Sequence, residues 1–404
     1  MSVLILILGI ILFISLVVIH EFGHFITARR NGVVAEEFGI FFPPRLYSRK
    51  MKGGWTFSIN LLPLGGFVKL KGEHDTDTEQ GAYGAASLWA KTKIMAAGVF
   101  MNLLVALVLL TILAVVGIPK IIPNQFTIAN DTKVSSQKVL IGQVEANSPA
   151  AKAGLHPQDI LTGIGKPGQH PVSVSNASKL PELTKRFAGQ KVDVYYQHDG
   201  TSKMSTTTLV SAQAVTASQK AYEKEIQNTK LDCAAINLPK GYLGISPTQY
   251  TIQRSTWSAP VTAIGLSAQV TALTFQGLGH AIGGLGSLIA GFVTGNNTAR
   301  SNGQCAATSQ VAGPVGIFVI LKDGSNLGLA FMLFIIAIIS LTLAIMNILP
   351  IPALDGGRLW LTLITRAINR PLSARREELI NATGFIILIC LIILITIVDV
   401  QRFF

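Results

Sequence analysis

Charged residues are scarce in this sequence. Asp, Glu, Lys and Arg make up 13% of its 404 residues, whereas hydrophobic residues make up 49%. Residues 2–19 contain no charged residue at all. A water-soluble domain usually carries about 25% charged residues, so the composition excludes a wholly soluble chain. We expect an integral membrane protein that also carries a soluble part.

Cysteine is also rare, and its spacing excludes a cysteine-based metal site. The three cysteines are far apart, at Cys233, Cys305 and Cys390, and do not form the short pairs that hold structural zinc. Cys390 falls in an apolar run, whereas the other two are expected outside the membrane. A Cys233–Cys305 disulfide is one interpretation, and free thiols are the other.

The sequence lacks a basic helix with interleaved aromatic residues, although its formal net charge is +12. Much of the positive excess flanks the apolar runs, above all in residues 29–93 and again from Arg358 to Arg376. Basic residues concentrate in the cytoplasmic loops of membrane proteins. We therefore expect the lipid bilayer as a partner and no nucleic acid, with residues 29–93 in the cytoplasm and the N-terminus outside.

The N-terminus has neither the basic n-region nor the Ala-x-Ala cleavage site of a signal peptide. The apolar run from residue 2 to about 28 exceeds the ~20 residues that a spanning helix needs. The sequence predicts a retained first span.

The end of this span carries the motif His-Glu-x-x-His, at His20, Glu21 and His24. Helical residues four apart lie on one face, so both imidazoles can reach one zinc ion with Glu21 beside them as a general base. Polar groups inside a span are costly unless they face a partner or a wet cavity. The alternative is a chance pentapeptide or two hydrogen-bonded buried histidines, which the membrane location disfavours.

A third zinc ligand is predicted at Asp355. This residue follows the uncharged run 326–354, with two prolines shortly before it and two glycines after it. Because proline ends or kinks a helix, the carboxylate is expected on a broken helix end, which inside a membrane is typical of a functional site. The alternative is that Asp355 caps the next helix.

These motifs resemble the site-2 protease family of intramembrane zinc metalloproteases, in its bacterial regulator-of-sigma branch. The resemblance covers most of the chain and rests on segments at 20–24 (HEFGH), 60–73 (NLLPLGGFVKLKGE), 98–102 (GVFMN), 142–155 (PDZ-like), 313–317 (GPVGI) and 347–357 (NILPIPALDGG). It implies a zinc endopeptidase in which His20, His24 and Asp355 bind Zn²⁺ and Glu21 is the catalytic base.

The resemblance also implies the substrates and their recognition. Expected substrates are single-span membrane proteins, such as anti-sigma factors already cut by an upstream site-1 protease, or remnant signal peptides. Asn347 is implied to hydrogen-bond the substrate backbone, with a helix-packing amide as the alternative. For Asn102, in Gly98-x-x-x-Asn102, we favour close helix packing with an interhelical hydrogen bond over a role beside substrate.

The expected fold is an α-helical polytopic membrane protein with about four transmembrane helices, a membrane-associated β-hairpin and one extracytoplasmic α/β PDZ domain. The N-terminal membrane part covers residues 1–118 and the C-terminal one 326–404; the predicted spans are 2–28, 94–118, 327–349 and 379–398. We expect a bacterial cell-membrane location, with both termini and the PDZ domain outside.

Two β-forming runs in the first cytoplasmic loop, 38–42 and 55–60, flank the turn residues Lys52-Gly53-Gly54. An ordinary cytoplasmic hairpin would explain them. The resemblance implies instead a sheet that offers an edge to extended substrate, because a helical peptide bond is hidden by its own hydrogen bonds.

The PDZ-like domain is predicted over residues 125–240. Strands are expected at 141–144, 159–161 and 192–197, a short helix at 148–155 and a hairpin turn at Asp199-Gly200. The sequence has Gln158-Asp159 where PDZ domains usually have Gly-Asp. Peptide capture by strand addition at Gly142, Gln143 and Val144 and a filter that excludes bulky substrates fit equally well.

Residues 241–325 are predicted to connect the two parts. The glycines between 277 and 286 are expected to break this segment, and 259–277 is expected to lie on the membrane surface. A crossing there would place Asp355 on the wrong face.

Two other functions remain open. A membrane zinc-binding transporter would need repeated halves around its path, and no repeat is found. A PDZ adaptor without proteolysis would not need Glu21.

Overall fold

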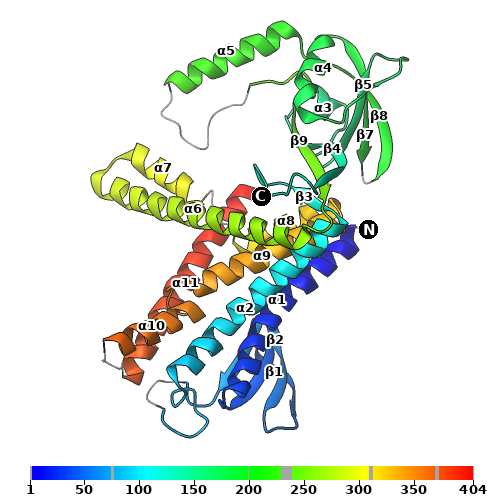
Figure 1. The fold of residues 1–404 in the computed structure, drawn as a ribbon. Helices are drawn as coiled ribbons and strands as arrows, with labels where there is room; N and C mark the ends of the chain where they lie inside the picture. The colour runs from blue at the N-terminus through cyan, green and yellow to red at the C-terminus, as the bar shows by residue number, and fades with distance from the viewer. Residues whose placement is uncertain are drawn as a thin grey trace. The chain divides into compact units, whose positions relative to one another are not determined.

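The computed structural model describes residues 2–73, 77–198, 200–228, 239–308, 313–368 and 373–403. The chain divides into two compact units. The first comprises residues 1–113, 260–274 and 312–404, and is mainly helical with a small sheet. The second comprises residues 114–259 and 275–311, and contains a larger sheet with helices (Figure 1).

Among the described residues, five helices are long and apolar enough to cross a membrane. They are α1 (Ser2–Arg30), α2 (Leu88–Val116), α6 (Ala259–Thr294), α9 (Leu329–Ile348) and α11 (Ala374–Phe403). The predicted spans 2–28 and 379–398 fall within α1 and α11. The predicted spans 94–118 and 327–349 overlap α2 and α9 and extend at most two residues beyond them.

Helix α6 differs from the expectation for residues 241–325. The predicted break at the glycines is wrong, because the helix runs without interruption through Gly279, Gly283 and Gly286. Each glycine costs a helix roughly 1 kcal/mol, and the apolar residues between them outweigh this cost. Its placement on the membrane surface stays a prediction.

The core of the helical unit forms around α1. This helix contacts α9 and α8 (Pro314–Asn326), a helix that the sequence did not indicate. Leu16, Leu321, Met332 and Ile336 from these three helices form one buried cluster. The backbone N–H groups of Gly313 and Gly316 donate to the buried Asp399 carboxylate of α11, over 2.9 and 2.7 Å. These contacts fix the N-terminal end of α8, where four N–H groups lack helical partners.

The predicted β-hairpin is confirmed. Strands β1 (Ala35–Lys50) and β2 (Thr56–Leu70) are joined by a turn in which Gly53 and Gly54 have positive φ. The first part of β1, residues 35–40, lies between two parts of β2. It pairs with residues 66–70 on one side and with residues 56–59 on the other. Residues 66–70 therefore form an outer edge of this sheet, and α1 contacts both strands (Figure 1).

The second unit contains a seven-stranded sheet in the order β3-β9-β4-β5-β7-β8, with β6 paired to β5. The strands are β3 (Ile118–Lys120), β4 (Lys133–Val144), β5 (Ile160–Gly165), β6 (Val172–Ser173), β7 (Lys191–His198), β8 (Thr201–Thr208) and β9 (Ile245–Arg254). The helices of this part are α3 (Pro149–Lys152), η1 (Ala177–Lys179), α4 (Leu180–Arg186), α5 (Ala212–Asn228) and α7 (Asn297–Thr308).

The strands and the short helix expected in this α/β unit are present. Ser148 accepts a hydrogen bond from Ala151 N–H at the start of α3, and Gly154 follows with φ +74°. The sheet continues past the expected boundary at residue 240, because β9 pairs along β4. Helix α5 was not predicted. Asp199 and Cys233 lie outside the described residues, so the disulfide is not observed; Cys390 is a free thiol.

Candidate metal centre and active site

Helix α1 presents the two histidines of the motif on one face. His20 and His24 are buried, with 7% and 5% of their surface exposed, and their ring centroids lie 4.9 Å apart. Two glycines allow α2 to approach this face. A Cβ at Gly23 would lie 2.8 Å from the Ala97 carbonyl oxygen, and one at Gly98 would lie 2.5 Å from Nε2 of both histidines. The predicted close packing through Gly98 is confirmed.

A backbone break after α9 positions the carboxylate. The helix ends at Ile348, and α10 (Asp355–Ala367) begins with Asp355 itself. Ala353 has φ +76°, a conformation that costs an L-residue about 1–2 kcal/mol. The two glycines after Asp355 are needed because a Cβ at Gly356 would overlap the Leu349 carbonyl.

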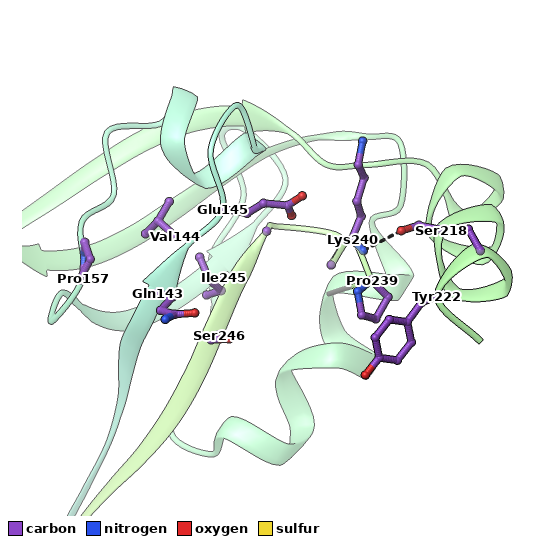
Figure 2. Close-up of a pocket in the computed structure, with 13 residues that line it drawn as sticks. Gln143, Val144, Glu145, Pro157, Ser218, Tyr222, Pro239, Lys240, Ile245 and Ser246 are labelled. Atoms are coloured by element: carbon purple, nitrogen blue, oxygen red, sulfur yellow. Dashed lines mark hydrogen bonds between the residues drawn. The ribbon is translucent and has the colours of Figure 1, made fainter. Parts of the chain in front are cut away.

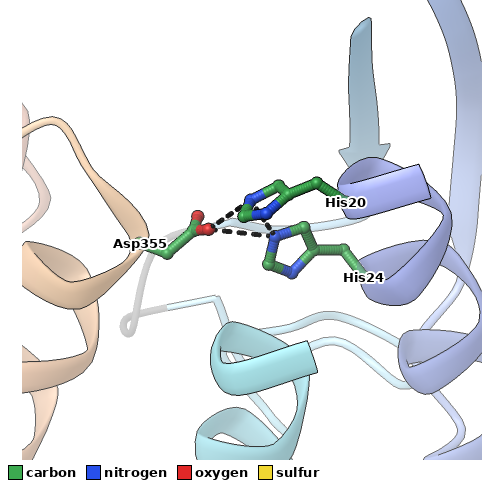
Figure 3. Close-up of side chains that lie close together, drawn as sticks. All are labelled: His20, His24 and Asp355. Carbon is green, nitrogen blue, oxygen red and sulfur yellow. Dashed lines mark hydrogen bonds and ion pairs between the residues drawn. The ribbon is translucent and has the colours of Figure 1, made fainter. Parts of the chain in front are cut away.

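Asp355 does not act as a helix cap. The N-cap position is Leu354, without a side-chain hydrogen bond, and the Asp355 carboxylate faces the two histidines instead (Figure 3). The alternative interpretation from the sequence is therefore not supported.

The three side chains converge with the spacing of a zinc site. Asp355 Oδ2 lies 2.8 Å from His20 Nε2 and 3.0 Å from His24 Nε2, and the two nitrogens lie 3.2 Å apart. Ligand atoms of a tetrahedral zinc ion with bonds of 2.0–2.1 Å are about 3.3 Å apart. Two imidazoles and one carboxylate are also a donor set that zinc prefers and that leaves one position open.

A backbone carbonyl fixes the orientation of His24. Its Nδ1 lies 2.7 Å from the Ile94 carbonyl oxygen of α2. A carbonyl only accepts, so Nδ1 carries the proton and Nε2 keeps its lone pair toward the other ligands. This is the tautomer that binds a metal.

The Asn102 side chain orients His20, as the Ile94 carbonyl orients His24. The amide is buried and lies 3.2 Å from His20 Nδ1, which confirms the predicted interhelical hydrogen bond. Asn102 Oδ1 has no partner among the described residues. The amide's two ends are distinguished only by their partners, and turning it places Oδ1 as the acceptor for His20 Nδ1–H. His20 then also presents an unprotonated Nε2, so the residues fit a zinc ion.

A small cavity of about 220 Å³ adjoins these ligands. Its lining includes Glu21, Asn347 and Asn102 together with His20 and Asp355. Glu21 lies at the β-hairpin side of the cavity, where a Cβ at Gly66 of β2 would be 3.3 Å from Glu21 Cγ. The cavity thus brings together a carboxylate that can exchange protons and two side-chain amides, and Gly66 of the edge strand packs against that carboxylate's side chain.

The other predicted binding residues lie elsewhere. Gly142, Gln143 and Val144 belong to β4 in the second unit, and the last two line a cavity of about 880 Å³ (Figure 2). That cavity lies between β4, β9 and α5, and its lining includes Glu145 and Lys240. Substrate binding by these residues, by Asn102 and by Asn347 stays a prediction.

Sequence reasoning missed Ile94 and Gly66. The contact of Ile94 is made through its backbone, which no side-chain motif can show. Gly66 carried a usable signal, since the pair Gly65-Gly66 interrupts a strand pattern, and such glycines often mark a close approach.

Comparison with known proteins gives the family. The profile of peptidase family M50 matches residues 8–391. A Clostridium acetobutylicum protein named "putative zinc metalloprotease" is 31% identical over 99% of this chain and 98% of its own length. A Clostridium perfringens protein of the same name is 28% identical over 98% of both chains. The Enterococcus faecalis protein named "probable protease eep" is 25% identical over 98% of both.

The chain belongs to peptidase family M50, the site-2 protease family. It is a zinc-dependent metalloprotease with several helices suited to a membrane. The expected family, enzyme class and cofactor are therefore confirmed.

Proposed function

We propose that this protein is an intramembrane endopeptidase that cuts the membrane-spanning segments of single-span membrane proteins. The observation that carries this proposal is the placement of His20, Glu21 and His24 inside the apolar helix α1, where both histidines are buried and Asp355 lies against them. Ionisable groups inside a membrane span are costly and mark a functional site.

In this proposal His20, His24 and Asp355 hold the zinc ion and Glu21 is the general base. Zinc, when bound, polarises the scissile carbonyl and lowers the pKa of water. Glu21 accepts the water proton and later delivers it to the leaving amine. Asn347, on the wall of the same cavity, donates its amide N–H to the substrate backbone.

The β-hairpin supports the proposal that a helical substrate is cut. Peptide bonds in a helix are shielded by their own hydrogen bonds, so the substrate must first become extended. Residues 66–70 form an outer edge of the hairpin sheet, and Gly66 approaches Glu21. A substrate that adds to this edge as a strand would pass the cavity with its peptide bonds exposed.

Cleavage of candidate substrates in vitro tests the proposal. The purified protein should cut within the membrane segment of a single-span anti-sigma factor already trimmed outside, or of a remnant signal peptide. A zinc chelator should abolish the cut, and Glu21→Gln should slow it about 10²–10⁴-fold. Cleavage confined to soluble regions, or an unchanged cleavage rate in the Glu21→Gln variant, would contradict it.

The proposed topology places the N-terminus, the α/β unit and the C-terminus outside a bacterial cell membrane. A cysteine introduced at Ser205 should then react with an impermeant reagent on intact cells, whereas cysteines at Arg49 and Arg375 should not. Labelling at position 375 from outside would contradict the four-span arrangement and indicate that α6 crosses the membrane.

The α/β unit is proposed to limit access to the site. It is inserted in the chain between α2 and the helices that lead to Asp355, so a substrate with a large outer domain would meet it, whereas one trimmed by a site-1 protease would pass. Replacing residues 121–250 by a flexible linker should allow cleavage of untrimmed substrate. If the variant instead cuts trimmed substrate more slowly and still ignores untrimmed substrate, the cavity at Gln143 and Val144 captures substrate tails.

A further inference from the structure

A second cluster of metal-binding side chains lies in the α/β unit. Among the described residues, two groups of three such side chains bring their ligand atoms within 4.8 Å of one another. One is the membrane site, and the other consists of His156, Asp159 and His198. The second group lies in one compact unit and repeats the two-histidine, one-carboxylate donor set.

We propose that His156, Asp159 and His198 bind a zinc ion on the surface of the α/β unit. Two imidazoles and a carboxylate favour zinc over Mg²⁺ or Ca²⁺, which take oxygen ligands. Three protein ligands leave a fourth position, and the exposure of His156 leaves that position open to water.

The Asp159 carboxylate is positioned as a metal ligand usually is. It is buried, with 3% of its surface exposed. Its Oδ2 accepts the backbone N–H of His156 over 2.8 Å, which turns Oδ1 toward His198. A ligating carboxylate held by a hydrogen bond to its second oxygen loses little freedom when a metal binds.

The two histidines approach this carboxylate from different parts of the fold. His198 is the last residue of β7, and its Nδ1 lies 2.7 Å from Asp159 Oδ1. His156 begins the turn before β5, and its ring centroid is 5.2 Å from that of His198. The comparable distance in the membrane site is 4.9 Å. The ligand atoms of all three groups lie within 4.8 Å of one another, and the exposed ring of His156 is free to turn toward the other two.

Zinc bound here would join the turn at residues 156–159 to the end of β7. Pro157, within that turn, lines the larger cavity (Figure 2). The ion would therefore stiffen one wall of the cavity without entering the proteolytic reaction.

Zinc content of the full-length protein tests the proposal. The protein would be purified in detergent, stripped with a chelator, reloaded with zinc and measured by mass spectrometry. His156→Ala and His198→Ala should each lower the content by about one ion per chain relative to the unsubstituted protein. This difference does not depend on how many ions the membrane unit holds. His170→Ala, which removes an exposed histidine of the same unit, should leave the content unchanged.

Thermal unfolding provides the second measurement and guards against misfolded variants. In the full-length protein, added zinc should raise the temperature at which the α/β unit unfolds, both without substitution and in the His170→Ala variant, whereas Mg²⁺ should not. His198→Asn keeps a donor for Asp159 and should melt normally without zinc but lose the response to zinc. An unchanged zinc content in the His156→Ala and His198→Ala variants, or an equal loss in His170→Ala, would overturn the proposal.

Discussion

The chain contains two His–Asp–His clusters, and their surroundings differ. In the membrane unit, His20 and His24 are almost fully buried. His20 contacts the Asn102 side chain, and His24 contacts the Ile94 carbonyl. In the α/β unit, His156 is exposed and the His198 side chain is 31% exposed. The same donors therefore lie in a shielded cavity in one case and at a solvated surface in the other.

This difference matches the roles that we propose, catalytic for the membrane cluster and structural for the surface cluster. The membrane cluster has Glu21 and two amides on the wall of an adjacent cavity, so a reacting peptide can meet a proton acceptor there. The surface cluster links a turn to a strand end. A donor set alone thus indicates which metal binds, and the groups around it decide whether chemistry follows.

The two clusters also differ in how the chain builds them. His20 and His24 are four residues apart on one helix, so one turn of helix aligns them. His198 lies 39 residues from Asp159, and only the neighbouring positions of β5 and β7 in the sheet bring them together. The first arrangement is visible in the sequence as a motif, whereas the second is visible only in the fold.

The largest expected effect separates the roles of ligand and base in the membrane cluster. His24→Ala should lose both the membrane-site zinc and all cleavage, because one of three ligands is removed. Glu21→Gln should keep the zinc and lose cleavage by about 10²–10⁴-fold, as expected for a general base. Zinc content and cleavage rate, measured on both variants, check this. Loss of zinc in Glu21→Gln would show that Glu21 is a ligand.

Gly98→Ala should disrupt the membrane cluster almost as severely as His24→Ala does, although it replaces none of the metal ligands. The added Cβ would lie 2.5 Å from Nε2 of both histidines, a distance that forces the rings or α2 to move. We expect loss of the membrane-site zinc and of cleavage, with zinc at the α/β unit retained. Gly279→Ala is the matched control, because a Cβ there meets no atom within 4 Å. Full activity of Gly98→Ala would show that the helices can separate without cost.

Asn102→Ala should have an intermediate effect. Loss of a group that orients a metal-binding histidine typically lowers metal affinity 10–100-fold, which competition with a chelator would measure. Asn102→Asp distinguishes the two amide orientations. It keeps an oxygen acceptor for His20 Nδ1–H and should largely retain zinc. Equal loss in both variants would mean that the amide donates to His20 instead.

Much of the membrane unit could be predicted from the sequence, for a physical reason. Long apolar runs must form helices in a bilayer, because every backbone group there needs an internal partner. The motif at His20–His24 and the broken run before Asp355 then located the cluster. The helix α8 escaped prediction because its apolar pattern is short and ends in Lys322-Asp323-Gly324, which reads as a loop.

The α/β unit was less predictable because its pairing is non-local. Strand β9 follows β8 only after α5 and pairs with β4, about 110 residues earlier. The glycines of α6 led to a wrong prediction for a different reason. Their low helix propensity suggested a break, but the helix continues through them. Propensity of about 1 kcal/mol per glycine is overridden when the flanking residues favour the helix.

The smallest expected effect concerns Gln158, where the sequence departs from the glycine of the usual PDZ pattern. Gln158 has φ +74°, so a residue with a Cβ occupies a left-handed conformation that costs roughly 1–2 kcal/mol. Gln158→Gly removes this strain but adds about 0.5–1 kcal/mol of backbone entropy in the unfolded state. The net gain should be between zero and about 1.5 kcal/mol.

Hydrogen exchange of the amides in β5 and β7 would detect this gain as a local slowing of opening. Gln158→Ala is the control, because it removes the same side chain but keeps the strained φ, and it should not slow exchange. Since Asp159 follows directly, the glycine variant also sharpens the comparison of the two clusters. If the surface cluster is structural, relieving strain beside it should leave zinc content and cleavage rate unchanged while the α/β unit becomes more stable. A fall in zinc content would instead show that the strained turn is what holds Asp159 in place.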